Sequence, residues 1–436
     1  MPNRRIKHTI ISGSVLIISM MMVGCSYQDD NASNSEQAAP QETSQIIEQD
    51  NSAEAIHERV MTLDSHVDIN EDMTFDPKYD PGTLTGQQVD LVKMESGGLD
   101  SAFFVVYMEQ TKRTPEGYAQ AKERALRKFD AIHRMTEQYP DRIGFAYSPA
   151  EVREIAASGR KVAMIGIENG YAIGKEISLL EDYYNRGARY MTLAHNGHND
   201  ICDSAQPQEK LGDGEEEHGG VSEYGYKVID EMNRLGMMVD ISHVSEKCMM
   251  QATSYSKAPP IASHSGVKAL AGHVRNMTDE QMIALADAGG VMQVVAFGPY
   301  VKFDPERNEL MMALIYKVAA TYDDEKFDFG KYMASDAFKE GMEAIDASNP
   351  EATIKEYIDH IDYAVKLIGI DHVGIVSDFE GGGGINGWKN AAETFNVTKE
   401  LVARGYSEED IAKIWSGNTL ALWERVNAVA AELNKQ

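Results

Sequence analysis

Residues 162–168 read VAMIGIE, a run of six apolar or small residues that ends in the carboxylate of Glu168. Such a run predicts a buried parallel strand that delivers its last side chain to the edge of a sheet. The same arrangement recurs along the chain, because metal-type side chains stand at the ends of other β-like runs: His66 and Asp68, His195, His243, His264 and Asp378. Ligand-type residues at successive strand ends are typical of the catalytic face of a (β/α)8 barrel.

Eight apolar runs predict strands, and stretches with one charged face predict helices between them. The strands are expected near residues 60–63, 101–107, 162–167, 189–194, 237–241, 260–263, 291–297 and 373–376. Helices are expected over residues 115–138, 221–235, 279–288 and 352–368. Eight alternations favour a closed (β/α)8 TIM-type barrel over an open doubly wound sheet. We interpret the long charged stretch over 299–349 as an insertion after strand 7, beside the site.

The first 24 residues have the features of an export signal. A basic start at Arg4, Arg5 and Lys7 precedes an apolar segment over residues 10–23, and Cys25 follows. We interpret residues 1–24 as a lipoprotein signal peptide and Cys25 as the lipidated mature N-terminus, with an ordinary secretory signal as the alternative.

The polar stretch that follows, residues 25–55, predicts a flexible tether, and residues 56–436 form the barrel. We therefore expect a lipid-anchored, extracytoplasmic protein attached to a membrane of the bacterial cell envelope.

Composition narrows the range of partners. The chain has 436 residues, 43% of them hydrophobic, and a formal net charge of −28. This acidity excludes a nucleic-acid partner, since phosphate binding needs a basic face. It also disfavours highly anionic substrates, although a local basic residue could hold one carboxylate. Cys202 and Cys248 do not stand in a paired metal spacing, so we interpret them as structural or free thiols.

Each ligand-type residue is weak support for a metal when it is taken alone. A histidine beside an aspartate is often only a hydrogen-bonded pair, and His243 and His264 could be core histidines bonded to backbone. Their shared position after successive strands favours a metal site. Nitrogen and carboxylate ligands without cysteine suit zinc, with manganese or cobalt as chemically suitable occupants.

Longer stretches resemble the membrane (renal-type) dipeptidases, metallopeptidases of the amidohydrolase-like superfamily, from about Val60 to the C-terminus. The similar stretches are Asp64 to Asp68, Arg189 to Asn196, Gly236 to Ser245, Ser263 to Ser265 with Arg275 and Asn276, and Gly369 to Phe379. The resemblance implies a dipeptidase with two Zn²⁺ ions per chain, a bridging hydroxide and dipeptide substrates, and it is compatible with a homodimer.

The resemblance also implies a role for each residue. His66 and Asp68 would bind one zinc, His243 and His264 the other, and Glu168 would bridge them. Three further roles concern the substrate: His195 would contact the scissile carbonyl and its oxyanion, Arg275 would hold the C-terminal carboxylate, and Asp378 would carry a proton from water to the leaving amine.

Departures from the family pattern leave substrate preference open. Asn169, Gln293 and Glu380 replace the commoner glycine, asparagine and aspartate, and none of them is an expected ligand. Dipeptides with a C-terminal D-residue are included among the expected substrates. The alternatives are another amidohydrolase reaction on an amide or lactone, and a lipoprotein that only binds peptides. Measuring the metal content distinguishes an enzyme from a peptide-binding lipoprotein, because a protein that only binds peptides does not need this set of metal ligands.

Overall fold

The structure is a computed structural model that describes residues 50–322, 332 and 335–435. The predicted signal peptide, Cys25 and most of the predicted tether lie outside the described residues. Within the described ranges, no helix combines the length and the apolar character that a membrane span needs.

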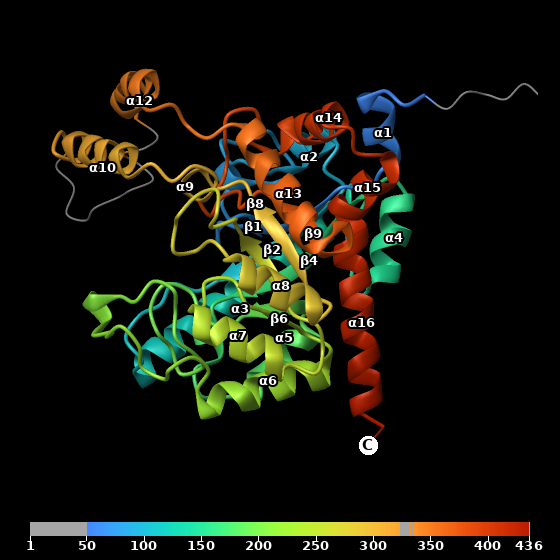
Figure 1. Cartoon of the computed structure of the whole chain (residues 1–436), viewed down its shortest axis with the longest axis vertical. Coiled ribbons are helices and arrows are strands. Elements are labelled where there is room, and N and C mark those ends of the chain that lie inside the picture. Colours follow the sequence, from blue (N-terminus) through green and yellow to red (C-terminus); the bar gives the residue numbers. More distant parts are fainter. Residues whose placement is uncertain (1–49, 323–331, 333–334, 436) are drawn as a thin grey trace, which may run out of the picture. The chain divides into compact units, whose positions relative to one another are not determined.

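Eight parallel strands form the centre of the fold, hydrogen-bonded in the order β1-β2-β4-β5-β6-β7-β8-β9. Their bounds are β1 Leu63–Asp68, β2 Ser101–Tyr107, β4 Lys161–Glu168, β5 Ala188–Thr192, β6 Met238–Asp240, β7 Ile261–Ser265, β8 Val291–Val295 and β9 Val373–Val376. Beyond the end of β9, the carbonyl of Phe379 accepts a hydrogen bond from the amide of Asp68 at 2.9 Å. The strands thus form a nearly closed barrel (Figure 1), which confirms the predicted (β/α)8 TIM-type fold.

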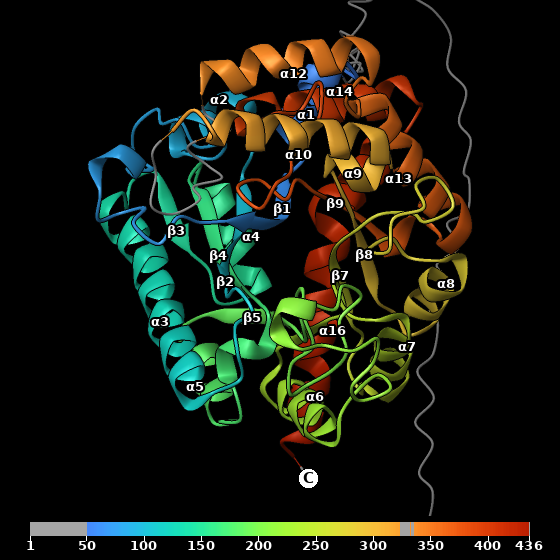
Figure 2. The same cartoon turned by 90° about the vertical axis from the view of Figure 1, so that its left-hand side faces the viewer.

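Helices surround this barrel (Figure 2). They are α1 Ala53–Arg59, α2 Leu91–Gly97, α3 Pro115–Gln138, α4 Pro149–Ala157, α5 Leu179–Asn185, α6 Glu223–Leu235, α7 Glu246–Tyr255, α8 Asp279–Asp287, α13 Ile354–Ile368, α14 Phe395–Ala403, α15 Glu408–Ala412 and α16 Asn418–Leu433. Polar caps decide where several of them begin. Thr278 and Thr353 complete capping boxes with Gln281 and Glu356, which satisfies free amide groups of the first turns of α8 and α13.

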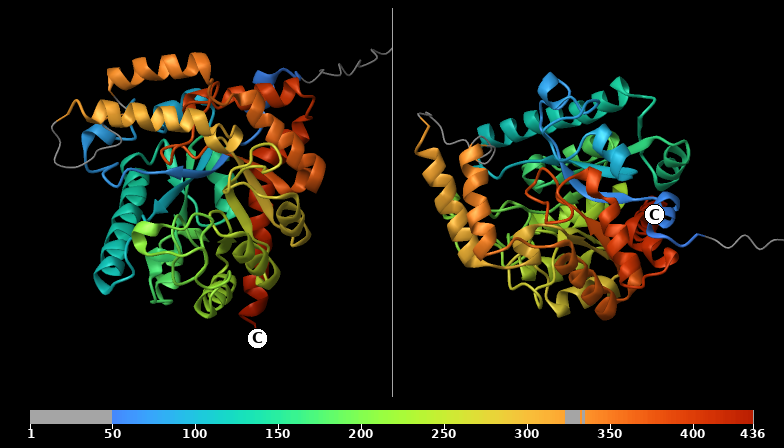
Figure 3. Two further views of the ribbon diagram at one scale, coloured as in Figure 1. Left: turned by 60° about the vertical axis from the view of Figure 1, so that its left-hand side comes forward. Right: turned by 90° about the horizontal axis from the view of Figure 1, so that it is seen from above.

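The predicted insertion after the seventh barrel strand is helical where the structure describes it. It contains α9 Gly298–Val301, α10 Pro305–Ala319 and α12 Asp336–Ser348. Figure 3 shows α10 and α12 side by side at the margin of the fold. They share a small core of their own, in which Ile315 and Val318 pack with Phe338. Helices α10 and α12 therefore form a separate small core, whereas Val301 of α9 packs in the main core.

Most predicted boundaries hold. From residue 101 onward, the predicted barrel strands coincide with observed strands to within two residues, and the helix over 115–138 has the predicted bounds. The first predicted strand, over 60–63, was wrong, because β1 begins at Leu63 and runs to Asp68. The polar residues of β1 are buried near the site, and hydrophobicity alone does not predict a buried strand from polar residues. The short strand β3, Ile143–Phe145, which pairs with β4 outside the barrel order, was missed.

Alternate strand residues fill the inside of the barrel. Phe103 and Val105 of β2 belong to a buried cluster with Met164 and with Trp423 of α16, whereas Phe104 packs in the larger cluster with the surrounding helices. The rings of Phe103 and Trp423 lie 6.0 Å apart. This is the period-two alternation of strands in a closed barrel. Most of this interior is apolar, with Gln293 of β8, bonded to Thr419, as a buried polar exception, and the ligand-type residues collect near the carboxyl ends of the strands.

Candidate active site at the carboxyl ends of the strands

The structure brings together all five residues that the sequence proposes as metal ligands. His66 and Asp68 lie on β1, Glu168 is the last residue of β4, His264 lies in β7, and His243 follows β6 by three residues. All five are buried. Parallel strands end on one face of a barrel, so residues that are far apart in sequence meet there.

Glu168 lies at the centre of the group. Its Oε1 atom is 3.1 Å from Nε2 of His243 and 3.3 Å from Nε2 of His264. Its Oε2 atom is 3.6 Å from Nε2 of His66. Each carboxylate oxygen thus faces a different set of imidazoles, as a carboxylate shared between two cations would.

Several buried polar atoms in this group have no ordinary partner. Nε2 of His66 and Oδ1 of Asp68 make no hydrogen bond with any described residue. Nε2 of His243 faces Nε2 of His264 at 2.7 Å. Buried polar atoms in proteins are nearly always satisfied, so these atoms need a further group. Imidazole nitrogens with carboxylate oxygens form a donor set that suits zinc.

Tyr190 orients the imidazole of His66. The Tyr190 hydroxyl donates to the carbonyl of Ser65 at 3.0 Å, so its oxygen is left to accept the Nδ1–H of His66 at 2.9 Å. In the neutral imidazole, this arrangement directs the lone pair of Nε2 at the centre of the site. Burial raises the pKa of Tyr190 well above its ordinary value, which keeps the phenol protonated.

A second chain of hydrogen bonds orients His264. Ser263 Oγ donates to Oδ2 of Asp240 at 2.6 Å and lies 2.8 Å from Nδ1 of His264. Asp240 also accepts the amides of Ser242 and Ser263. Such outer hydrogen bonds fix the orientation and tautomer of metal-binding histidines. Sequence reasoning missed both Tyr190 and Asp240, although Asp240 is a carboxylate inside an apolar strand and Tyr190 lies within a family-like stretch.

Electrostatics separates His66 from the other two histidines. Burial disfavours a charged His66, but the carboxylates of Glu168, Asp68 and Asp378 outweigh it and raise its pKa to about 10. Burial instead lowers the pKa values of His243 and His264 well below the ordinary value, with a contribution from the guanidinium of Arg275 in each case. Without a cation, His66 therefore carries a proton and the other two imidazoles are neutral.

His195 and Asp378, the two residues expected to act in catalysis, lie in the same group. Nε2 of His195 is 3.6 Å from Oε1 of Glu168, and its ring lies 4.0 Å from that of His243. Oδ1 of Asp378 is 4.0 Å from Nε2 of His66. Burial lowers the pKa of His195 and raises that of Asp378 well above its usual range. A neutral imidazole and a carboxyl group that holds a proton readily are thus placed together.

The backbone is strained at this site. His243, Asp378 and Glu380 have φ angles of 66°, 61° and 64°, and Asn169, beside Glu168, has a φ of 80°. Non-glycine residues rarely adopt this left-handed region, and it persists mostly where function requires it.

Close packing requires a glycine at position 381, just after Glu380. A Cβ atom at Gly381 would lie 2.4 Å from Oδ2 of Asp68 and 2.7 Å from Oδ1 of Asp378. The absence of a side chain at Gly381 therefore lets the carboxylates of Asp68 and Asp378 approach this segment.

Four ligand-type residues line a cavity of about 330 Å³ together with His195 and Asp378: Asp68, Glu168, His243 and His264. Its walls also include Tyr107, Lys128, Phe297 and Tyr300. Arg275 is not part of this lining. It lines a neighbouring cavity of about 250 Å³, and its guanidinium lies 5.4 Å from the centre of the Tyr300 ring. Nη2 of Arg275 donates to the carbonyl of His264 at 3.2 Å, whereas its buried Nε has no hydrogen-bond partner among the described residues. Arg275 therefore lines the neighbouring cavity, next to Tyr300 of the first cavity, and its Nε is free to donate a hydrogen bond.

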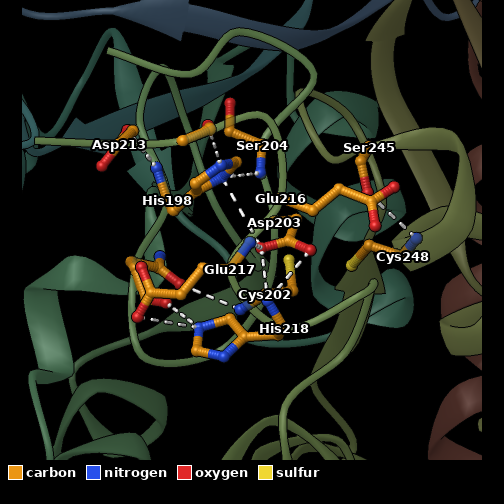
Figure 4. Close-up of polar contacts among 12 residues, drawn as sticks. His198, Cys202, Asp203, Ser204, Asp213, Glu216, Glu217, His218, Ser245 and Cys248 are labelled. Carbon is orange, nitrogen blue, oxygen red and sulfur yellow. Dashed lines mark hydrogen bonds and ion pairs between the residues drawn. The ribbon is translucent and has the colours of Figure 1, made fainter. Parts of the chain in front are cut away.

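The loop after β5 is held by a buried polar network (Figure 4). Asp203 accepts the amides of Glu217, His218 and Gly220. His198 uses both ring nitrogens, since Nδ1 accepts the amide of Ser204 and Nε2 lies 3.0 Å from the carbonyl of Gly214. His198 and His218 thus support the loop.

The same loop braces two site residues. Ser204 Oγ donates to the carbonyl of His195, and the amide of Ala205 donates to the carbonyl of His243 at 2.8 Å. Cys202 and Cys248, both buried, are free thiols, as predicted.

Comparison with known proteins finds one matching family and several similar proteins. A family model described as membrane dipeptidase (peptidase family M19) matches residues 50–436. The chain is 30% identical over 366 residues to the dipeptidase tcpJ of Claviceps purpurea (strain 20.1), which covers 83% of this chain and 74% of that protein. It is also 30% identical over 351 residues to the dipeptidase aclJ of Aspergillus oryzae (strain ATCC 42149 / RIB 40). That match covers 79% of this chain and 72% of the relative.

Solved structures share the fold. The probable dipeptidase PvdM from Pseudomonas aeruginosa has a TM-score of 0.76 and 34% sequence identity, over 86% of this chain and 98% of that one. A metallo peptidase from Rhodobacter sphaeroides, liganded with a phosphinate mimic of the dipeptide L-Ala-D-Ala, has a TM-score of 0.65 and 21% identity, over 84% and 99%. The second similarity is one of fold alone.

Proposed function

We propose, from the premise that the chain belongs to the membrane dipeptidase family (peptidase family M19) and is a metallo-dipeptidase, that it hydrolyses dipeptides with two zinc ions. His66 and Asp68 would hold one ion, His243 and His264 the other, and Glu168 would lie between them. The observation that carries the proposal is the position of Glu168, whose two carboxylate oxygens face different imidazoles.

When bound, zinc would acidify a water molecule and polarise the scissile carbonyl. The remaining tasks belong to the chain. The neutral imidazole of His195 would donate a hydrogen bond to the carbonyl oxygen as negative charge develops on it. Asp378 would take a proton from the attacking water and pass it to the leaving amine, a task that suits a carboxyl group whose pKa burial has raised.

Arg275 would bind the C-terminal carboxylate of the dipeptide. Its Nε is buried without a partner, and a substrate carboxylate accepts paired hydrogen bonds from a guanidinium. The proposal places the substrate's C-terminal end near Tyr300, toward the neighbouring cavity. It includes dipeptides whose C-terminal residue has the D configuration.

One assay series tests the proposed function. The protein is stripped with a chelator, reloaded with zinc, and assayed on matched L,L and L,D dipeptides while metal content is measured by mass spectrometry. We expect activity to disappear on stripping and to return with zinc, at two ions per chain. Full turnover by metal-free protein would contradict the proposal, and saturation at one ion would contradict the binuclear site.

We also propose that Cys25 is lipidated and anchors the protein outside the cytoplasm at the bacterial cell envelope. The support is the order of basic residues, apolar segment and cysteine in the sequence. Cys25→Ser should move the protein from the membrane fraction to the soluble fraction. An unchanged distribution, with no lipid mass on the wild-type N-terminus, would leave a simple secretory signal.

A further inference from the structure

Lys128 is a buried lysine without an ionic partner. Three other basic residues of α3 pair with acids: Lys122 with Glu176, Arg124 with Glu71 and Arg127 with Asp72. Lys128 is only 5% exposed, yet its ammonium makes no hydrogen bond and no ion pair with any described residue. Lysine is rarely buried in proteins unless it is paired, so a lysine in this position favours an anionic partner inside the cavity that it lines.

The ammonium of Lys128 has access to the active site. Lys128 lines the same cavity as Glu168, His195 and Asp378. Its Nζ lies 5.5 Å from the centre of the Tyr107 ring, and that ring lies 4.8 Å from the ring of His195. Tyr107 ends β2. Lys128 and Tyr107 therefore form one wall of the cavity, on the side of β2.

This wall lies across the barrel from Arg275. In the cyclic order of the eight barrel strands, β2 is second and β7, which Arg275 follows, is sixth. Strands four positions apart in a closed eight-stranded barrel face each other. A substrate whose carboxylate lies toward Arg275 and whose scissile carbonyl lies at the metal ligands therefore extends its amino-side residue toward Lys128.

We propose that Lys128 binds an anionic side chain on the amino-side residue of the substrate, so that dipeptides beginning with glutamate or aspartate form a preferred substrate class. This inference rests on the proposed function, because the orientation of the dipeptide depends on Arg275. A side-chain carboxylate in the cavity would accept a charge-assisted hydrogen bond from this ammonium. In a chain with a net charge of −28, such a local cation is what an acidic substrate requires.

A second role for Lys128 is balancing the charge of the metal ligands, and the test below distinguishes it from substrate binding. Burial lowers the pKa of Lys128, and the carboxylates of Asp68, Glu71 and Glu168 oppose this effect by favouring its charged form. Lys128 could therefore serve only to balance the negative charge of the metal ligands. In that case its removal would lower zinc affinity and would slow all dipeptides alike.

The test compares Glu-Ala with Gln-Ala, which have nearly the same shape and differ in one charge. For zinc-loaded wild type we expect kcat/KM for Glu-Ala to exceed that for Gln-Ala roughly 10- to 100-fold, mainly through KM, as one charge-assisted hydrogen bond contributes. Lys128→Met should bring this ratio close to one, and Lys128→Glu should invert it. Lys122→Met, which removes an exposed charge from the same helix, should leave the ratio at its wild-type value.

The outcomes are distinct. A wild-type ratio near one, an undiminished ratio in Lys128→Met, or an equal loss on both substrates together with lost zinc would overturn the assignment. Discrimination confined to the pair Ala-Glu and Ala-Gln would overturn the placement on the amino side. Failure of wild type to hydrolyse Ala-Ala would instead refute the proposed function, and binding of Glu-Ala against Gln-Ala by calorimetry would still show whether Lys128 reads the charge.

Discussion

Tyr190→Phe should weaken zinc binding without changing any ligand. The substitution removes one oxygen atom, and with it the 2.9 Å contact to Nδ1 of His66 and the 3.0 Å hydrogen bond to the carbonyl of Ser65. Freed from Tyr190, the imidazole of His66 loses the contact that fixes its orientation and tautomer. Changes of this kind around metal-binding histidines lower affinity about 10- to 100-fold, and we expect a loss in this range.

The same substitution also costs stability, so a control is needed. Each buried partner left unsatisfied costs about 1–3 kcal/mol. Tyr183 is a suitable match, because it is fully buried and its hydroxyl donates to the carbonyl of Ala172 at 3.1 Å, a contact outside the ligand group. Tyr183→Phe should lower the free energy of unfolding of the metal-free protein but leave zinc affinity unchanged.

Competition with a chromophoric chelator measures zinc affinity, and urea unfolding of the stripped proteins measures stability. The expected pattern is a loss of stability in both variants and a loss of zinc affinity in Tyr190→Phe alone. Wild-type zinc affinity in Tyr190→Phe, or equal losses in both variants, would refute the view that Tyr190 positions a ligand.

Three further expectations concern protons and charge. Asp378→Asn should keep its zinc and bind dipeptide while turnover falls about 10²- to 10⁴-fold, the usual contribution of a general acid or base, and near-normal turnover would remove Asp378 from the mechanism. Arg275→Met should raise KM for a dipeptide sharply and reduce the preference for the free acid over its C-terminal amide, and a variant that still discriminates fully would show that another residue reads the carboxylate. Zinc binding at pH 8 should release a proton from His66, in addition to any that the acidified water loses, because the His66 pKa of about 10 lies above this pH. Calorimetry in buffers of different ionisation enthalpy measures this release, and none at pH 8 would mean that His66 is already neutral.

Periodicity in the sequence predicted the barrel well because strand and helix formation depend on local patterns. The runs over 101–107 and 373–376 coincide with β2 and β9. Prediction was wrong at β1, where burial is decided by the site: Asp64, Ser65 and His66 are polar, yet all three are fully buried. Hydrophobicity cannot anticipate a strand whose polar side chains find their partners on other strands.

The site shows the same division between local and long-range information. Ligand-type residues could be identified because each ends or follows an apolar run. The residues that orient them could not, since their roles depend on contacts across the barrel: Tyr190 reaches His66 over 124 positions of sequence. Lys128 was missed for a related reason. It lies inside a helix with a charged face, where a lysine is ordinarily solvated, and only the folded chain shows that it lines the cavity.

The strained residues connect the fold to the chemistry. Strands β6 and β9 end before His243 and Asp378, and each of these residues takes a positive φ angle. If these strands continued, successive side chains would point alternately to the two faces of the barrel wall. The left-handed turn instead redirects the chain at the residue whose side chain reaches the centre of the site. Such conformations cost about 1–3 kcal/mol each and persist only when the surroundings hold them. For His243 the surroundings include the amide of Ala205, which binds its carbonyl, and for Asp378 they include the amide of Gly383, whose 2.7 Å bond to the Asp378 carbonyl closes the turn. The loops after the strands therefore do more than connect helices, because they hold two site residues in conformations that a regular strand would not provide.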